Sequence, residues 1–173
     1  MVLSLSDNEF SVLSFLVRNF TERLTIRNVA QRLDFSAAGV FNILKKLEKE
    51  NIVIGEKLGT GLFYSINFEN KIALHIAEIV LLYSDEKLSL NAEPFRHAKA
   101  AMFDRKNLLL IVDNVMVLNF TIPNVNIISK TEEELTDLLR RKDSEILQML
   151  KKGAVLFGEE EFAGIIKNCA QRF

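Results

Sequence analysis

Residues 25–53 read TIRNVAQRLDFSAAGVFNILKKLEKENIV and contain two apolar patterns of helical period with a polar turn between them. Thr25 stands where its hydroxyl can cap the first helix, and Ser36 stands in the same position before the second. The residues expected to point inward are Val29, Ala30 and Leu33 on the first helix, and Val40, Ile43, Leu44 and Leu47 on the second. The sequence therefore predicts two short helices joined by the brief turn Asp34-Phe35-Ser36.

A hairpin is predicted directly after the second of these helices. Asn51 is placed to take the left-handed conformation that ends a helix. Beyond it, residues 52–54 and 62–66 are short apolar runs typical of strands. The loop between the two runs contains residues that supply turn conformations, namely Gly55, Gly59, Thr60 and Gly61.

Another helix is predicted upstream. Ser6 followed by Glu9 forms a capping box, in which each side chain satisfies a backbone N–H of the other residue, so the helix begins near Asp7. Its apolar stripe consists of Phe10, Leu13, Leu16, Val17 and Phe20. The expected order is three helices followed by a hairpin.

This order resembles the winged helix-turn-helix of archaeal-type transcriptional regulators. Residues 25–33 look like the second helix of that family, and residues 35–53 look like its recognition helix running into the wing. The chain departs from the pattern at Asn51, where the family more often has glycine. The resemblance implies a sequence-specific regulator that binds double-stranded DNA as a homodimer.

The resemblance also indicates which side chains meet DNA. On the recognition helix, Asn42 suits adenine, Phe41 suits a thymine methyl, and Lys45 or Lys46 suits phosphate or guanine. Contacts to the phosphate backbone are expected from Arg27, Arg32, Lys49 and Lys57. The expected DNA-binding set is Arg27, Arg32, Ser36, Ala37, Ala38, Phe41, Asn42, Lys45, Lys46 and Lys57.

Charge limits the affinity of this domain for DNA, because the whole chain has a net charge of -1 and its first seventy residues are neutral. Their basic residues are Arg18, Arg23, Arg27, Arg32, Lys45, Lys46, Lys49 and Lys57. Their acidic residues, equal in number, are Asp7, Glu9, Glu22, Asp34, Glu48, Glu50, Glu56 and Glu69. Each phosphate contact adds about 0.9 to the salt dependence of binding, so a domain with few contacts gains from dimerisation, which doubles them.

Residues 72–83 are apolar almost all round, unlike a surface helix. The helix either lies between the two halves of the chain or pairs with its copy in a dimer, and the sequence leaves both open. Residues 84–93 are polar enough to be a linker. The expected domains are residues 1–69, a linking helix and linker at 70–92, and a second domain at 93–173.

The second domain is expected to mix helices and strands, which makes the fold class α+β. The predicted helices are residues 94–105, one capped by Ser129 with Glu132 in a capping box, residues 144–151 and residues 159–169. The predicted strands are residues 108–112, 115–122 and 125–128.

Residues 125–135, with residues 153–160 behind them, resemble the distal part of the minimal nucleotidyltransferase domains of archaea. That family needs a Gly-Ser turn for the triphosphate and an Asp-x-Asp pair for magnesium. Residues 100–107 contain no glycine, and the strand after them offers only Asp113. We therefore expect a degenerate, non-catalytic domain for dimerisation or sensing, and not an enzyme.

Composition excludes several other classes. No apolar run reaches the ~20 residues of a membrane span, and the start of the chain has no basic leader, so we expect a cytoplasmic protein without membrane contact. Cys169, His75 and His97 form no metal-ligand cluster, so neither metal nor cofactor is expected. An effector or protein partner stays open. The alternative function is an interaction adaptor or antitoxin-like partner whose winged helix binds protein.

Overall fold

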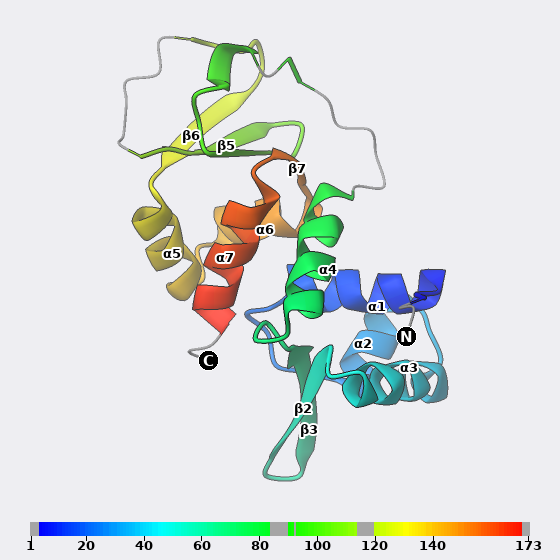
Figure 1. The fold of residues 1–173 in the computed structure, drawn as a ribbon. Helices are drawn as coiled ribbons and strands as arrows, with labels where there is room; N and C mark the ends of the chain where they lie inside the picture. Colours follow the sequence, from blue (N-terminus) through cyan, green and yellow to red (C-terminus); the bar gives the residue numbers. More distant parts are fainter. Residues whose placement is uncertain (1–3, 84–89, 92, 114–119, 171–173) are drawn as a thin grey trace. The chain divides into compact units, whose positions relative to one another are not determined.

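The computed structural model describes residues 4–83, 90–91, 93–113 and 120–170. The chain folds as two compact units, Met1–Val80 and Leu81–Phe173 (Figure 1). Both contain helices and strands, in agreement with the expected α+β class. None of the helices within the described ranges combines the length and apolar character that crossing a membrane requires.

The N-terminal unit contains the three predicted helices, the hairpin and the linking helix. In chain order its elements are α1 (Asp7–Arg18), β1 (Leu24–Thr25), α2 (Ile26–Leu33), α3 (Ala37–Lys49), β2 (Val53–Leu58), β3 (Gly61–Ile66) and α4 (Lys71–Leu82). The predicted loop is shorter than expected, because Gly55 lies in β2 and Gly61 in β3. Only Gly59 and Thr60 separate the strands, and the hairpin extends away from the three helices (Figure 1).

Side-chain caps fix where the helices begin. The Ser6–Glu9 capping box opens α1, and a second box between Thr25 and Asn28 opens α2. At α3 the Ser36 hydroxyl accepts a hydrogen bond from the backbone N–H of Gly39 at 3.0 Å. These caps confirm the predicted starts, and the contacts that make them lie within three residues.

The sheet of this unit has the order β1-β3-β2, with antiparallel neighbours. Val53 pairs with Ile66 at the base of the hairpin, and Leu58 pairs with Gly61 at its tip. The short strand β1, which the sequence analysis missed, pairs Leu24 with Tyr64. Because β1 has two residues and a partner far along the chain, it leaves no periodic signal in the sequence.

The core of the N-terminal unit lies between the helices and the sheet. It consists of residues at most 5% exposed, among them Val12, Leu13, Leu16, Val17, Val29, Ala30, Val40, Leu44, Leu47, Tyr64 and Ile66. Phe10, Phe20, Leu33 and Ile43, which were also expected inside, are half-buried. The helical period therefore predicted the buried faces of α1, α2 and α3 except at these margins.

A cluster of asparagines, Asn51, Asn67 and Asn70, joins the end of α3 to the start of α4. Asn51 takes the predicted left-handed conformation, with φ of 60°. The side-chain amide of Asn67 donates to the backbone carbonyl and side-chain oxygen of Asn51, both at 3.0 Å, and that of Asn70 donates to the same carbonyl at 2.9 Å. Asn70 also accepts from the N–H of Ile72, in the first turn of α4.

The C-terminal unit is a mixed sheet with helices on one side. Its elements are η1 (Glu93–Phe95), β4 (Ala100–Phe103), β5 (Asn107–Ile111), β6 (Asn126–Lys130), α5 (Glu132–Arg140), α6 (Ser144–Lys152), β7 (Ala154–Phe157) and α7 (Glu159–Ala170). The sheet order is β6-β5-β4-β7, in which only β5 and β6 run parallel. Phe95 of η1 packs against the face opposite the helices, with Ala101, Phe103, Leu108 and Leu110 (Figure 1).

The predicted helix over residues 94–105 is wrong. The chain forms only the single turn η1 and then β4, which pairs with β5 from Ala100↔Ile111 to Phe103↔Leu108. The polar residues after β4 make a hairpin turn, in which the Asp104 carboxylate accepts from the backbone N–H groups of Lys106 and Asn107. The four residues of β4 have a neighbouring strand on each side, β5 and β7, and these pairings outweigh their local helix preference.

The predicted cap at Ser129 is also wrong. Ser129 lies in β6, and the helix is capped by Thr131, whose capping box is with Glu134. Both pairs have the spacing of a capping box, and pairing of β6 with β5 as far as Lys130 decides between them. The helices at 144–151 and 159–169 and the strands at 108–112 and 125–128 are confirmed within two residues.

Two sequence predictions fall on the gaps in the described ranges. The linker at residues 84–93 lies largely outside them, and so does most of the predicted strand 115–122. The described part of that strand, residues 120–122, is not in a sheet. Cys169 is buried in α7.

Candidate nucleic-acid interface

The turn between α2 and α3 sets how α3 is presented. Asp34 has a left-handed backbone with φ of 55°, which ends α2. The backbone N–H of Phe35 then donates to the carbonyl of Ala30 at 2.9 Å, and Ser36 caps the next helix. Since each residue of this turn is hydrogen-bonded or capped locally, α2 and α3 form a fixed helix-turn-helix.

The third helix has one buried and one exposed side. Val40, Leu44 and Leu47 have no measurable exposure. The exposed side begins with Ala37 and Ala38 and continues through Phe41, Asn42 and Lys45. Phe41 is 43% exposed, which is unusual for a large aromatic side chain and leaves its ring available to a partner.

Lys46 is held by an ion pair with the first helix. Its Nζ lies 2.6 Å from Oε1 of Glu9, whose side chain is only 8% exposed. Burial favours a raised pKa for Glu9, but hydrogen bonds from Lys46 and from the backbone and hydroxyl of Ser6 outweigh it and lower the pKa. The same hydrogen bond raises the pKa of Lys46. Lys46 therefore joins α3 to α1, a role that the sequence analysis missed.

Lys45 is paired within its own helix. Its Nζ lies 2.7 Å from Oε2 of Glu48, and this hydrogen bond raises the pKa of Lys45. The Glu48 carboxylate in turn lies over the backbone of Gly55 in β2, where an added Cβ would come within 2.6 Å of it. Glycine at this position lets the recognition helix and the wing pack closely.

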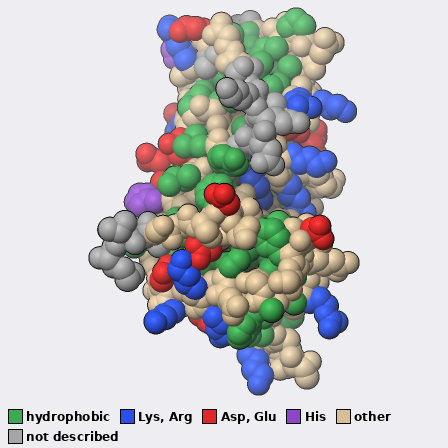
Figure 2. Space-filling view, turned by 90° about the vertical axis from the view of Figure 1, so that its right-hand side faces the viewer, with side chains coloured by type: hydrophobic (Ala, Val, Ile, Leu, Met, Phe, Trp, Pro, Cys, Tyr) green, Lys and Arg blue, Asp and Glu red, His purple; other side chains and the backbone are tan. Residues whose placement is uncertain are grey.

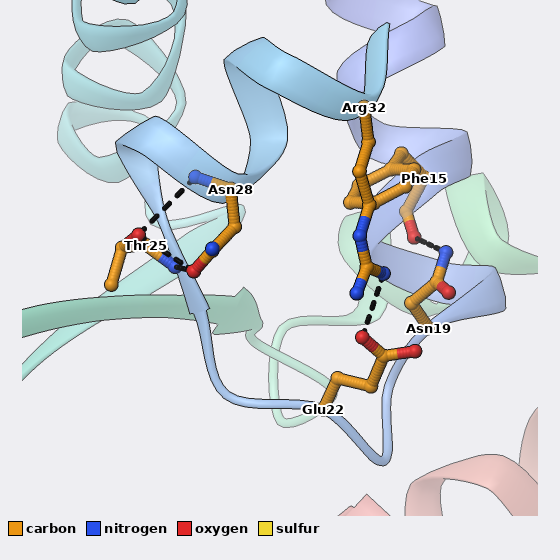
Figure 3. Close-up of polar contacts among 6 residues, drawn as sticks. All are labelled: Phe15, Asn19, Glu22, Thr25, Asn28 and Arg32. Atoms are coloured by element: carbon orange, nitrogen blue, oxygen red, sulfur yellow. Dashed lines mark hydrogen bonds and ion pairs between the residues drawn. The ribbon is translucent and has the colours of Figure 1, made fainter.

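Arg32 is also engaged inside the domain (Figure 3). Its Nη1 lies 2.7 Å from Oε2 of Glu22, and its guanidinium carbon lies 5.6 Å from the centre of the Phe15 ring. An arginine over an aromatic face and beside a carboxylate gains from both contacts. Arg32 thus connects α2 to α1 and to the segment after it, and is less available to phosphate than its position in the sequence suggests.

Five cations of this unit are exposed and form no ion pair with the residues that the structure describes. They are Arg23 before β1, Arg27 in α2, Lys49 at the end of α3, Lys57 in the wing and Lys71 at the start of α4. On the face that Figure 2 shows, basic and acidic side chains are interspersed and do not gather into one basic patch. The free positive charge is consistent with a few phosphate contacts from separate elements.

The arrangement of α1 to α3 and the hairpin is a winged helix-turn-helix, and comparison with known families refines it. Residues 3–59 match the sequence model of the MarR family. They form a MarR-family winged helix-turn-helix domain. The match runs from the start of the chain to the tip of the wing and indicates a DNA-binding transcriptional regulator. It leaves the C-terminal unit unidentified, and a search of curated proteins found no match to the chain.

The sequence analysis placed the candidate residues on the right elements of this MarR-family domain and predicted the cap at Ser36, but it missed the ion-pair partners of the cations. Ser36 serves as a cap, and Lys45, Lys46 and Arg32 are ion-paired. The sequence contained one signal for the ion pair of Lys46, because Glu9 is an acidic residue in α1, a helix that contributes apolar residues to the core of the domain. Glu9 lies 37 residues away from Lys46, however, so the pair could not be read from spacing.

Proposed function

We propose that the protein is a sequence-specific transcriptional regulator that binds double-stranded DNA as a homodimer. In this proposal α3 enters the major groove, and Arg27 and Lys57 contact phosphates on either side of it. The observation that carries the proposal is the exposed surface of α3, from Ala37 to Asn42, on a domain of the MarR family. The buried side of the same helix is fixed in the core, so its exposed side has a defined orientation.

The proposed homodimer forms through α4. One side of this helix is buried, at Ala73, Ile76, Ala77 and Val80. Its other side carries Ile72, Ile79 and Leu82, and Tyr83 follows the last residue of the helix; these four side chains are 45–56% exposed. Ile72 and Ile79 are seven residues apart and therefore lie on one face, as in helices that pair with a copy of themselves. Pairing would cover this apolar surface and double the number of phosphate contacts.

For the C-terminal unit we propose a non-catalytic role in dimerisation or sensing, as a degenerate relative of nucleotidyltransferases. Asp113, the carboxylate that follows β5, lies 2.6 Å from Nζ of Lys99. The hydrogen bond to Asp113 raises the pKa of Lys99, so this carboxylate has an ammonium group as its partner. A magnesium-dependent transfer of labelled nucleotide that disappears in Asp113→Asn would overturn the proposal.

A titration by fluorescence anisotropy tests the DNA-binding function. The full chain is titrated against short duplexes tiled across its own promoter region, at about 50 mM salt, where phosphate contacts contribute most. We expect saturable binding to one tile and an affinity that falls with salt. Arg27→Ala should reduce the salt slope by about 0.9 for each phosphate lost. The matched control, Lys106→Ala in the β4–β5 turn, should leave it unchanged. Binding to no tile would overturn the proposal.

The second candidate function is binding of a protein partner by the winged helix. The neutral charge of the domain and the exposed ring of Phe41 favour it. It predicts that Phe41→Ala abolishes association with that partner and that no tile is bound. DNA binding that depends on Arg27 and Lys57 would exclude it as the main function.

A further inference from the structure

The part of α3 that would meet bases carries no free charge. Recognition helices contact base edges mainly with their N-terminal residues. In this helix those residues are Ala37, Ala38, Phe41 and Asn42, all of them exposed. Three of the four are apolar, and the fourth is an amide.

The two lysines that follow on α3, Lys45 and Lys46, form ion pairs with glutamates of the same domain. Lys45 is paired with Glu48 at 2.7 Å, and Lys46 with the buried Glu9 at 2.6 Å. Lys49, which has no ion pair among the described residues, lies in the last turn of the helix, and α3 contains no arginine. Guanine is read most often by arginine or lysine, which donates to its O6 and N7 atoms. The base-reading part of α3 therefore has no donor of the kind that guanine needs.

Its side chains suit A·T pairs instead. In the major groove thymine presents a C5-methyl group, which alanine and phenylalanine side chains contact, and adenine presents N6 and N7, which asparagine binds with two hydrogen bonds. Phe41 is the large hydrophobic side chain of this surface and is 43% exposed. Asn42 is the next residue along the helix and lies beside it.

From this placement we propose that α3 reads A·T base pairs, with Phe41 contacting thymine methyl groups and Asn42 binding adenine. The inference rests on the proposed DNA-binding function and adds to it a preference for A·T base pairs. Phe41 is then the residue that selects thymine over any base without a methyl group. Removing one buried methyl weakens binding about fourfold.

A thymine-to-uracil exchange in the DNA isolates this contact, because uracil lacks the C5-methyl and keeps every hydrogen-bonding group of thymine. The probe is the promoter tile that the full chain binds best, prepared once with thymine and once with uracil. We expect the wild-type protein to bind the uracil duplex at least about fourfold more weakly. A second pair of duplexes, with adenine or 7-deazaadenine, removes N7 and tests Asn42 in the same way.

Two variants assign the effect to a residue. Phe41→Ala should bind the thymine and uracil duplexes equally, and Asn42→Ala should bind adenine and 7-deazaadenine duplexes equally. Ile54→Ala is the matched control, since Ile54 is an apolar side chain 45% exposed in β2, and it should keep both differences. Each result is a ratio measured on one protein sample, so a partly unfolded variant does not alter it.

The possible failures can be told apart. Equal binding of thymine and uracil duplexes by the wild-type protein overturns the inference and leaves the DNA-binding function in place. A methyl effect that persists in Phe41→Ala overturns the role of Phe41. Binding to no tile at low salt overturns the proposed function and this inference together.

Discussion

Lys46 of the recognition helix reaches Glu9 in the first turn of α1, with 2.6 Å between Nζ and Oε1. The two residues are 37 positions apart in the chain, and the carboxylate is almost completely buried. A side chain that looks like a DNA contact in the sequence is therefore part of the framework that holds α3. A charge reversal at Lys46 would place two carboxylates together and would test the fold of the domain and not its interface.

The first prediction concerns the pH dependence of this pair. The folded-state pKa of Glu9 is below its ordinary value of 4.5, so its contribution to stability is present above that value and is lost as pH falls through the lowered pKa. The pKa of Lys46 is raised above 10.5, so its contribution is lost only as pH rises through the raised pKa. Lys46→Met should lower the melting temperature most between about pH 5 and pH 10.

Thermal unfolding of both proteins across this range measures the effect. The difference in melting temperature should shrink as pH falls below 4.5 and through the lowered pKa of Glu9, where the carboxylate becomes protonated. Lys49→Met removes a lysine of the same helix that has no ion pair with the described residues, and it should show no such profile. A difference that is constant with pH would contradict the assignment.

The second prediction concerns the asparagine cluster at the end of α3. Asn67→Ala removes two hydrogen bonds to Asn51 and the bond that the Asn67 side chain accepts from the N–H of Glu69. Asn67 is itself only 7% exposed, but Asn51 and Glu69 are exposed and their freed groups regain water, so we expect a loss of about 1–2 kcal/mol in unfolding free energy.

Urea unfolding followed by tyrosine fluorescence measures this loss. The chain has no tryptophan and two tyrosines, of which Tyr64 is buried in the core of the N-terminal unit. Asn8→Ala, an exposed position of α1, is the control and should change the free energy by less than about 0.5 kcal/mol. Equal effects of the two substitutions would rule out a stabilising role for the cluster.

The third prediction compares two glycines of the C-terminal unit. Gly158 has φ of +73°, and a Cβ there would come within 2.4 Å of the carbonyl oxygen of Lys99 and 2.5 Å of the Cβ of Ala100. Gly158→Ala should cost about 2–4 kcal/mol, from the backbone strain and the clash together. Gly164, inside α7, has open space around it, so Gly164→Ala should stabilise the unit by about 0.5–1 kcal/mol.

Amide hydrogen exchange in β4, β7 and α7 measures both substitutions. The two variants make the same chemical change within seven positions of each other, and the expected signs are opposite. Similar protection in both would mean that the close approach of Gly158 to β4 is not important for stability.

The fourth prediction concerns the proposed homodimer. Ile79→Glu places a charge on the exposed side of α4, where Ile79 is 56% exposed, and should give a monomer. Light scattering coupled to size-exclusion chromatography measures the mass. A monomer has lost the winged helix of its partner protomer, so it should also bind DNA at least about tenfold more weakly, because two linked binding sites strengthen each other.

Ile54→Glu is the control for this experiment, because it adds the same charge at an isoleucine 45% exposed outside α4. It should leave the mass unchanged. A dimer that survives Ile79→Glu would mean that another surface joins the two chains, and a monomeric wild-type protein would remove the homodimer from the proposal.

Local sequence determined most of the N-terminal fold. The capping residues Ser6, Thr25 and Ser36 act within three positions, and the helical period of the apolar residues requires no distant partner. These signals predicted α1, α2 and α3, the left-handed Asn51 and the candidate surface of α3. Each of them is a property of a single segment.

Tertiary structure decided what depends on residues far apart in the chain. It turned the expected helix over residues 94–105 into η1 and β4, because β5 and β7 supply hydrogen-bonding partners on both sides of β4. It moved the cap of α5 from Ser129 to Thr131 for the same reason. It also engaged Lys46 with Glu9 and Arg32 with Glu22, and so separated the cations that hold the domain together from Arg27 and Lys57, which form no ion pair within the described ranges. The spacing of residues in a sequence sets helix faces and caps, whereas an ion pair or a strand pairing needs the folded chain to bring its two halves together.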